Sequence, residues 1–366
     1  MGFELIFGPL VVLSGMLVGF TLGVDTVNIL QPVTATAAME QRGLSSEVAT
    51  RNLVTNIAQV ADFDTEFHEV GAKDIAGDGF VESVARALSI DETVLAARRL
   101  PGAIAAEFQP EFIERDSGTV LRLRMTRPAT GVHLVEEFTV EGDAFEPVFR
   151  KASRAILVVI DPVTLAMDDL WQGDLVSAGQ SIERALRATA GQQRQVAETL
   201  LGIRQLAEGD AVTAERTLRA AIWRRTDFAP AHLALARALA QTRGPDAARA
   251  VLEDLDLHAA GGTWSERAAR EVPAAAAYVR ARLAAAEGDW PEAVALLHQA
   301  TTAVPTFAAA HEALVEAYLA QREAPFAEYH AETALRLTAP DVPRFDDQLD
   351  HMLQLAVTPI RPRPGS

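Results

Sequence analysis

The sequence predicts a mainly helical protein in which an N-terminal transmembrane helix precedes a small α+β module and an α-solenoid of about five helix–turn–helix repeats. Three observations carry this prediction. Residues 5–24 form an uncharged run long enough to cross a bilayer. Two alternating segments in the middle of the chain are typical of a β-hairpin. Small residues then recur at intervals close to 34 residues. The expected boundaries are 1–25, 26–158, 159–341 and 342–366.

The composition excludes several classes of function. The 366 residues carry a net charge of -17, and a nucleic-acid-binding surface needs the opposite sign. The chain has no cysteine, so disulfides, thiolate metal sites and cysteine nucleophiles are excluded. Hydrophobic residues make up 49% of the chain and charged residues 23%, which indicates a folded protein rather than a disordered one.

The uncharged run is interpreted as an uncleaved membrane anchor. A cleaved signal peptide would carry Lys or Arg before a shorter apolar stretch, and no basic residue precedes residues 5–24. The first basic residue is Arg42, so the positive-inside rule has almost nothing to count. We expect a short cytoplasmic N-terminus with the body of the protein on the other side of the membrane. The alternative is a body in the cytoplasm.

Glycines form one stripe along this predicted helix, at Gly8, Gly15, Gly19 and Gly23. Small residues at this spacing let a second helix approach closely in a membrane. A homodimer and a separate membrane partner would both fit such a stripe. The alternative is that glycine is simply common in membrane helices.

The α+β module is read from its hydrophobic periods. Residues 27–33 are an apolar, extended exit from the membrane, and Ser45 caps a helix with an apolar face. Residues 119–126 and 132–140 alternate as two strands of a hairpin, and residues 144–160 return to helix.

Two clusters in this module are candidate sites. Asp74 and Asp78 lie in a glycine-containing turn, but the spacing and the closing Glu of a calcium loop are absent. Arg122, Arg124 and Arg127 could bind an anion, although the solvated face of a half-buried strand is the simpler reading. The sequence therefore predicts no metal site here.

The C-terminal half repeats itself. An alanine recurs in one frame, at Ala178, Ala214, Ala248, Ala293 and Ala327. The intervals between these alanines are 36, 34, 45 and 34 residues. Gly-Asp pairs precede three of them, beginning at Gly173, Gly209 and Gly288. Such a period is the signature of stacked helical hairpins.

The pattern resembles the tetratricopeptide repeat. The residues that match in two units are Leu201, Gly202, Ala214, Leu218 and Ala221, and then Ala293, Leu297, Ala300 and Pro305. The resemblance covers about half of the chain, and most units lack the aromatic residues usual in the first helix. The longest interval indicates an insertion near residues 261–272, which would widen the groove or lengthen a loop. With its anchor, the whole chain resembles bacterial membrane-anchored tetratricopeptide proteins of unassigned function.

The resemblance implies a concave groove, lined by the first helices, that binds segments of partner proteins. Its lining would include Trp171, Ile203, Leu233, Arg237, Gln241, Tyr278, Arg282, Glu312 and Glu316. Arg237 and Arg282 fall at equivalent places and could pair with a ligand carboxylate, or could be solvated or paired with neighbouring acids. His232 and His311 recur in one frame, which favours a structural role.

The expected function follows from these features. No nucleophile, base and acid assemble into a catalytic motif, so we expect a non-enzymatic protein without cofactor or metal. The favoured function is a scaffold or adaptor, anchored in the inner membrane with a periplasmic body, that binds partner proteins through the groove. The alternative is an accessory structural or assembly subunit of a larger membrane complex. A capping helix near residues 345–356 and a Pro-rich tail would end the chain.

Overall fold

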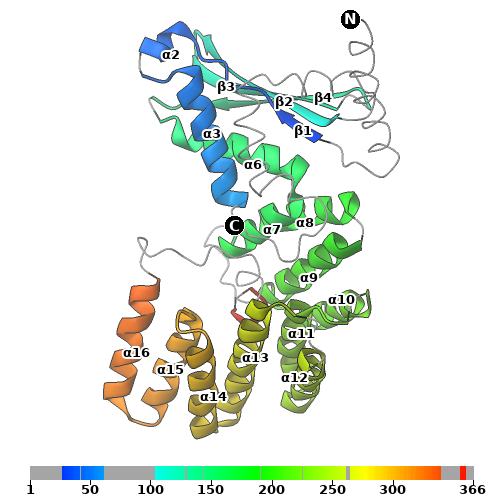
Figure 1. The fold of residues 1–366 in the computed structure, drawn as a ribbon, viewed down its shortest axis with the longest axis vertical. Helices are drawn as coiled ribbons and strands as arrows, with labels where there is room; N and C mark the ends of the chain where they lie inside the picture. Colours follow the sequence, from blue (N-terminus) through cyan, green and yellow to red (C-terminus); the bar gives the residue numbers. More distant parts are fainter. Residues whose placement is uncertain are drawn as a thin grey trace, which may run out of the picture. The chain divides into compact units, whose positions relative to one another are not determined.

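The computed structural model describes residues 27–61, 104–338 and 355–359, apart from positions 42, 128–129, 143, 190, 225 and 261–263 (Figure 1). The described chain falls into two compact units, one built around a sheet and one built from stacked helices. In the described residues the divisions fall inside two helices, after Ile57 and after Ile156. Each unit is described by itself below.

The first unit holds a four-stranded sheet in the order β1-β2-β3-β4. The strands are β1 (Val27–Leu30), β2 (Ile104–Arg115), β3 (Gly118–Arg127) and β4 (Val132–Thr139). β1 pairs with β2 in parallel, and the later pairs are antiparallel. The predicted hairpin is confirmed as β3 and β4. β2 was not predicted, because it contains Pro110 and a proline inside a run argues against a strand.

Helices cover one face of this sheet. They are α2 (Ala37–Gln41), α3 (Ser46–Ala61) and α6 (Glu146–Ile160). Phe112 of β2 meets the ring of Phe149 of α6 edge-on, with ring centroids 5.9 Å apart. The hydroxyl of Ser153 donates to the carbonyl of Leu53 at 3.2 Å, which ties α6 to α3. Ser45 caps α3 as predicted, since its Oγ accepts the amide of Val48 at 3.3 Å.

The opposite face of the sheet carries a charge network. Arg122 pairs with Glu137 at 2.9 Å, and Arg124 pairs with Glu111 at 2.6 Å. Arg115 also contacts Glu137, at 2.6 Å. Arg122 and Arg124 thus have carboxylates from neighbouring strands as partners, so for these two arginines the strand-face interpretation holds rather than an anion site.

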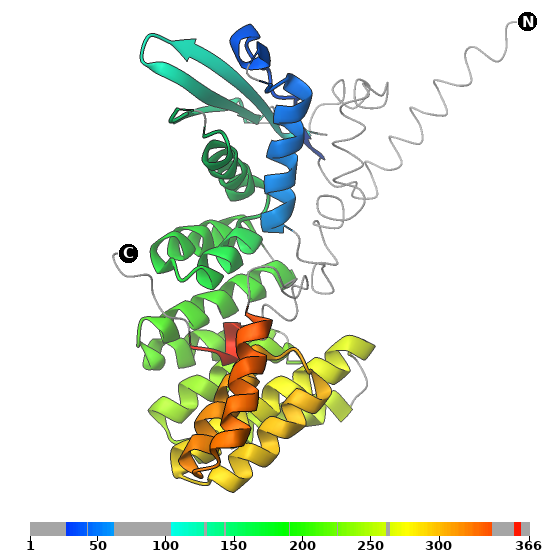
Figure 2. The ribbon, with the colours of Figure 1, turned by 90° about the vertical axis from the view of Figure 1, so that its left-hand side faces the viewer.

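The second unit is an array of five helix pairs, which run from green to orange in Figures 1 and 2. The pairs are α7 (Pro162–Trp171) with α8 (Leu175–Ala188), α9 (Gly191–Ala207) with α10 (Ala211–Arg224), α11 (Ala229–Thr242) with α12 (Pro245–Ala260), α13 (Glu266–Glu287) with α14 (Trp290–Ala303), and α15 (Ala308–Ala320) with α16 (Ala324–Leu337). The number of predicted repeats is therefore confirmed.

The recurring alanines are buried residues of the second helix in each pair. All five are at most 3% exposed, at Ala178, Ala214, Ala248, Ala293 and Ala327. Gly202 of α9 shows how close the helices come, because a Cβ there would lie 2.5 Å from Cγ of Leu218 in α10. Only small residues permit this approach, and the larger apolar residues fill the layers between the crossings.

The turn inside each pair needs a left-handed residue. Gly173, Gly209, Gly244 and Gly288 supply it with φ between 73° and 90°. The aspartate that follows Gly173 and Gly288 caps the second helix by accepting a backbone amide. In the fifth pair Arg322 takes the glycine's place at φ 61°. The Gly-Asp pairs of the sequence therefore mark turns, not ligand loops.

The insertion mainly lengthens a helix. α13 has 22 residues, whereas α11 has 14 and α15 has 13. The extra residues extend its N-terminal end, which Ser265 caps by accepting the amide of Ala268 at 3.1 Å. The sequence left two outcomes open for the insertion, a wider groove or a longer loop. In the described residues it mainly lengthens the first helix of the fourth pair.

Some predictions lie outside the described residues. These are the anchor at residues 5–24 with its four glycines, the turn with Asp74 and Asp78, and most of the expected cap. Among the helices that the structure describes, none combines the length and the apolarity that a membrane crossing requires.

Candidate functional site

The predicted groove residues come from the first helices of successive pairs, as expected. Ile203 of α9 and Leu233 of α11 are buried, at 1% and 0% exposure. Trp171 ends α7 and packs, partly buried, against the same apolar cluster. Gln241 and Glu312 are exposed, on α11 and α15. Ile203 and Leu233 therefore belong to the core, whereas Gln241 and Glu312 lie at the surface.

Arg237 of α11 has an unexpected partner. Its Nη1 donates to the carbonyl oxygens of Leu355 at 3.2 Å and Ala356 at 2.7 Å. Burial lowers the pKa of Arg237 to about 10, although the nearby Tyr278 raises it, so the side chain stays charged at neutral pH. Within the described part of the chain, no carboxylate pairs with it. The guanidinium is thus held by backbone carbonyls.

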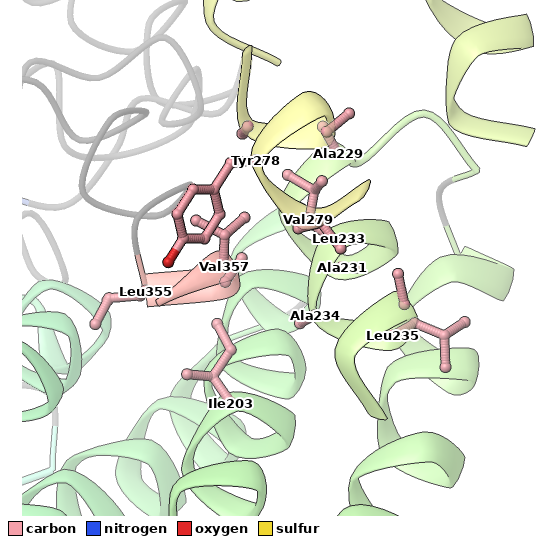
Figure 3. Close-up of a cluster of buried hydrophobic side chains, with 14 of the residues drawn as sticks. Ile203, Ala229, Ala231, Leu233, Ala234, Leu235, Tyr278, Val279, Leu355 and Val357 are labelled. Carbon is pink, nitrogen blue, oxygen red and sulfur yellow. The ribbon is translucent and has the colours of Figure 1, made fainter. Parts of the chain in front are cut away.

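The residues that supply these carbonyls are a short helical stretch, 355–357. Leu355, Ala356 and Val357 are 3%, 0% and 3% exposed. Figure 3 shows Leu355 and Val357 in one apolar cluster with Ile203 and Tyr278. We call Ile203, Arg237 and Tyr278, together with what they contact, the tail site.

Tyr278 of α13 links the tail site to a charged pair. Burial raises the pKa of its hydroxyl, and the neighbouring cations Arg282 and Arg237 oppose this shift. Arg282 itself pairs with Glu316 of α15 at 2.5 Å. Tyr278 also packs against Phe307, with ring centroids 5.2 Å apart. The two arginines predicted as equivalent therefore differ, since Arg282 has an acidic neighbour and Arg237 has carbonyls.

The recurring histidines are structural, as the sequence suggested. His232 contacts the carbonyl of Thr226 at 2.7 Å, and His311 contacts the carbonyl of Pro305 at 3.1 Å. Each ring thus closes the turn that precedes its own helix. His311 also meets His330 through their Nδ1 atoms at 2.9 Å. In the described ranges no group of three or more His, Asp or Glu side chains is arranged to hold a metal.

Sequence reasoning missed the tail site's occupant. The predicted capping helix at residues 345–356 lies mostly outside the described residues, but Leu355 and Ala356 contact Arg237 of α11, in the third pair. Both residues are buried there. The apolar triplet before Pro359 was the available signal.

Comparisons with known proteins give only remote likenesses. No protein-family model and no curated protein matches the chain. A crystal structure of MamA protein is 20% identical, with a TM-score of 0.32, over 48% of this chain and 92% of that one. A structure of MamA from residue 41 to the end, from Desulfovibrio magneticus RS-1, is 16% identical, with a TM-score of 0.33, over 48% of this chain and 95% of that one. A crystal structure of the APC/C hetero-tetramer Cut9-Hcn1 is 16% identical, with a TM-score of 0.43, over 57% of this chain but only 39% of that one.

The repeat type is therefore read from the chain itself. Five helix pairs follow one another in the described residues; each has a buried alanine in its second helix, and most turn at a left-handed glycine. Two of the four intervals between the alanines are the 34 residues of the tetratricopeptide unit. The helical unit of this chain is an array of helical hairpins whose repeat length resembles that of the tetratricopeptide unit.

Proposed function

We propose that this protein is a non-enzymatic scaffold that binds segments of partner proteins on the first-helix face of its repeat array. The observation that carries the proposal is the tail site, where Arg237 and Tyr278 surround a short peptide segment with apolar side chains. A site that holds one such segment has the chemistry to hold another, because its contacts are backbone carbonyls and apolar side chains.

The test uses a photocrosslinking amino acid in place of Gln241. This exposed residue lies one helical turn beyond Arg237, on the same face of α11. The matched control places the crosslinker at Trp223, which is 84% exposed on α10. We expect discrete protein adducts from position 241 in cells, lost when Arg237→Glu is added, and none from position 223. Equal adducts from both positions would contradict the proposal.

We further propose that residues 5–24 anchor this scaffold in the inner membrane, with the body in the periplasm. The support is the uncharged run and its glycine stripe in the sequence. A membrane-bound partner or an identical chain would pack against that stripe, which is also how an accessory subunit of a membrane complex would be held. Membrane fractions washed with alkaline carbonate test the anchor, since an anchored chain stays in the pellet.

Leucine at Gly15, Gly19 and Gly23 separates the two functions. If an accessory subunit is the correct description, these changes release the chain from its complex in mild detergent while it stays in the membrane. If the scaffold is correct, the crosslinks through position 241 persist in the same variant.

A further inference from the structure

Residues 355–357 are bound to the array in the manner of a ligand. Leu355 and Val357 are buried to 3% exposure on either side of Ala356, which is fully buried. All three belong to the apolar cluster that also contains Ile203 and Tyr278 (Figure 3). The segment therefore contributes side chains to the array although it lies outside the repeated helix pairs.

The polar contact explains why a helical end is recognised. The last carbonyls of a helix lack intrahelical partners and carry partial negative charge. Arg237 satisfies two of them through one nitrogen, Nη1. The remaining positive charge stays in place at neutral pH, so the site favours a segment whose chain direction presents carbonyl groups to α11.

The packing sets the side chains that such a segment needs. Ala356 has no exposed surface, which leaves no room for a larger side chain between its neighbours. Leu355 and Val357 supply the apolar surface. The recognised pattern is thus one aliphatic residue, one small residue and one aliphatic residue at the end of a helical turn.

We infer that the tail site is a receptor for short helical ends of this pattern and that the chain's own residues 355–357 are its resident occupant. This inference rests on the proposed function and names its ligand. A partner segment binds by displacing the resident one. The scaffold is consequently closed in isolation and opens only to a segment that competes with a copy on the same chain.

The tether makes this competition steep. Leu355 follows Leu337, the last residue of α16, by 18 positions. Attachment to the same chain holds a segment at an effective concentration on the order of millimolar. A free segment with an intrinsic dissociation constant of about 100 μM would therefore bind the intact chain about tenfold more weakly than a chain whose own segment has been removed from the site.

The experiment compares two full-length chains. In one, Leu355→Asp and Val357→Asp place charges in the apolar cluster and remove the resident segment. In its matched control, Val176→Asp and Val212→Asp add the same charges at residues that are 54% and 63% exposed. The probe is a fluorescent peptide with the sequence of residues 350–361, and fluorescence anisotropy measures its binding. Circular dichroism checks that both chains keep their helix content.

We expect the opened chain to bind the peptide at least tenfold more tightly than the control chain and the unchanged chain. Adding Arg237→Met to the opened chain should weaken binding by about tenfold. A peptide with Phe in place of Ala356 should bind neither chain. Absence of binding to the opened chain, or equal binding to all chains, would overturn the inference.

These outcomes are distinct from those of the crosslinking test. Purified chains and a synthetic peptide report only on the resident segment. Crosslinks in cells report on other proteins. If the opened chain binds the peptide but position 241 yields no adducts, the inference about the resident segment stands and the proposed scaffold function is rejected.

Discussion

Arg237 and Ala356 are 119 positions apart in sequence, yet Nη1 of the arginine donates to the carbonyl of the alanine at 2.7 Å. This contact, with a second one to Leu355, joins the middle of the repeat array to a segment beyond its last helix pair. It is the polar part of an otherwise apolar packing. Its removal therefore separates the contribution of the charge from that of the apolar side chains.

We predict that Arg237→Met loosens residues 355–357 without unfolding the array. Methionine fills much of the space but leaves two carbonyls without a donor, at a cost of about 1–3 kcal/mol in docking free energy. Hydrogen exchange at the amides of 355–357 should accelerate by about 5- to 100-fold. The control Arg282→Met loses only the half-exposed ion pair with Glu316, so hydrogen exchange at the amides of 355–357 should not change.

A second prediction concerns the closest helix crossing. Gly202→Ala places a Cβ 2.5 Å from Cγ of the buried Leu218, so α9 and α10 must separate. Overpacking of this kind lowers the free energy of unfolding by about 1–3 kcal/mol. Gly179→Ala is the matched variant, because its nearest atom is Cζ of Arg204 at 2.9 Å, on a flexible side chain. Urea unfolding should rank Gly202→Ala as the less stable; equal loss in both variants would contradict the argument.

Acid should weaken the last repeats through their histidines. Burial and the neighbouring His311 and His298 lower the pKa of His330 to about 4, and burial also lowers the pKa of His311. An unfolded histidine binds its proton near 6.5, so the folded chain holds fewer protons than the unfolded one between these values. Stability is therefore full above pH 6.5 and falls as the pH drops towards 4.

The variant His330→Phe tests the origin of this acid sensitivity. A phenyl ring keeps the stacking on Tyr318, where ring centroids are 5.7 Å apart, but it cannot take up a proton. Tyr329 and Arg336 line the same pocket as His330. Thermal unfolding at pH 7.5 and pH 5 should differ less in the variant than in the unchanged chain. An unaltered difference would assign the effect to other groups.

Arg322→Gly should stabilise the protein. Arg322 has φ 61°, which strains a residue with a Cβ, and glycine occupies the equivalent turns. Relief of this strain should exceed the entropy that glycine adds to the unfolded chain, for a gain of about 0.5–1 kcal/mol. The control is the reverse change Gly209→Ala, at φ 84°, which should destabilise. Both are measured as shifts of the unfolding midpoint.

The repeats could be predicted because their signal is local and recurs. Ala214 and Leu218 lie on one helical face, and a glycine turn precedes them, so a single unit already contains its own pattern. β2 carried no such signal, since a proline inside a run argues against a strand and its partners are supplied by β3 and the distant β1. The sequence of a single strand does not show which distant strand it pairs with.

The tail site escaped sequence reasoning for a related reason. The resemblance placed Arg237 on the first-helix face correctly, because position within a repeat fixes which side of α11 it occupies. Its partner could not be read from the repeat, since residues 355–357 lie outside the period. Three apolar residues carry too little pattern to reveal where they bind.

The long separation of Arg237 from Ala356 also has a consequence for biosynthesis. At about 5–20 residues per second, a ribosome needs about 6–24 s to add the 119 residues that follow the arginine. During that interval the helix pairs can stack in order, each on the one already made, but the receptor has no resident segment. The nascent chain is thus open to helical ends of other proteins at a stage when the finished chain is closed.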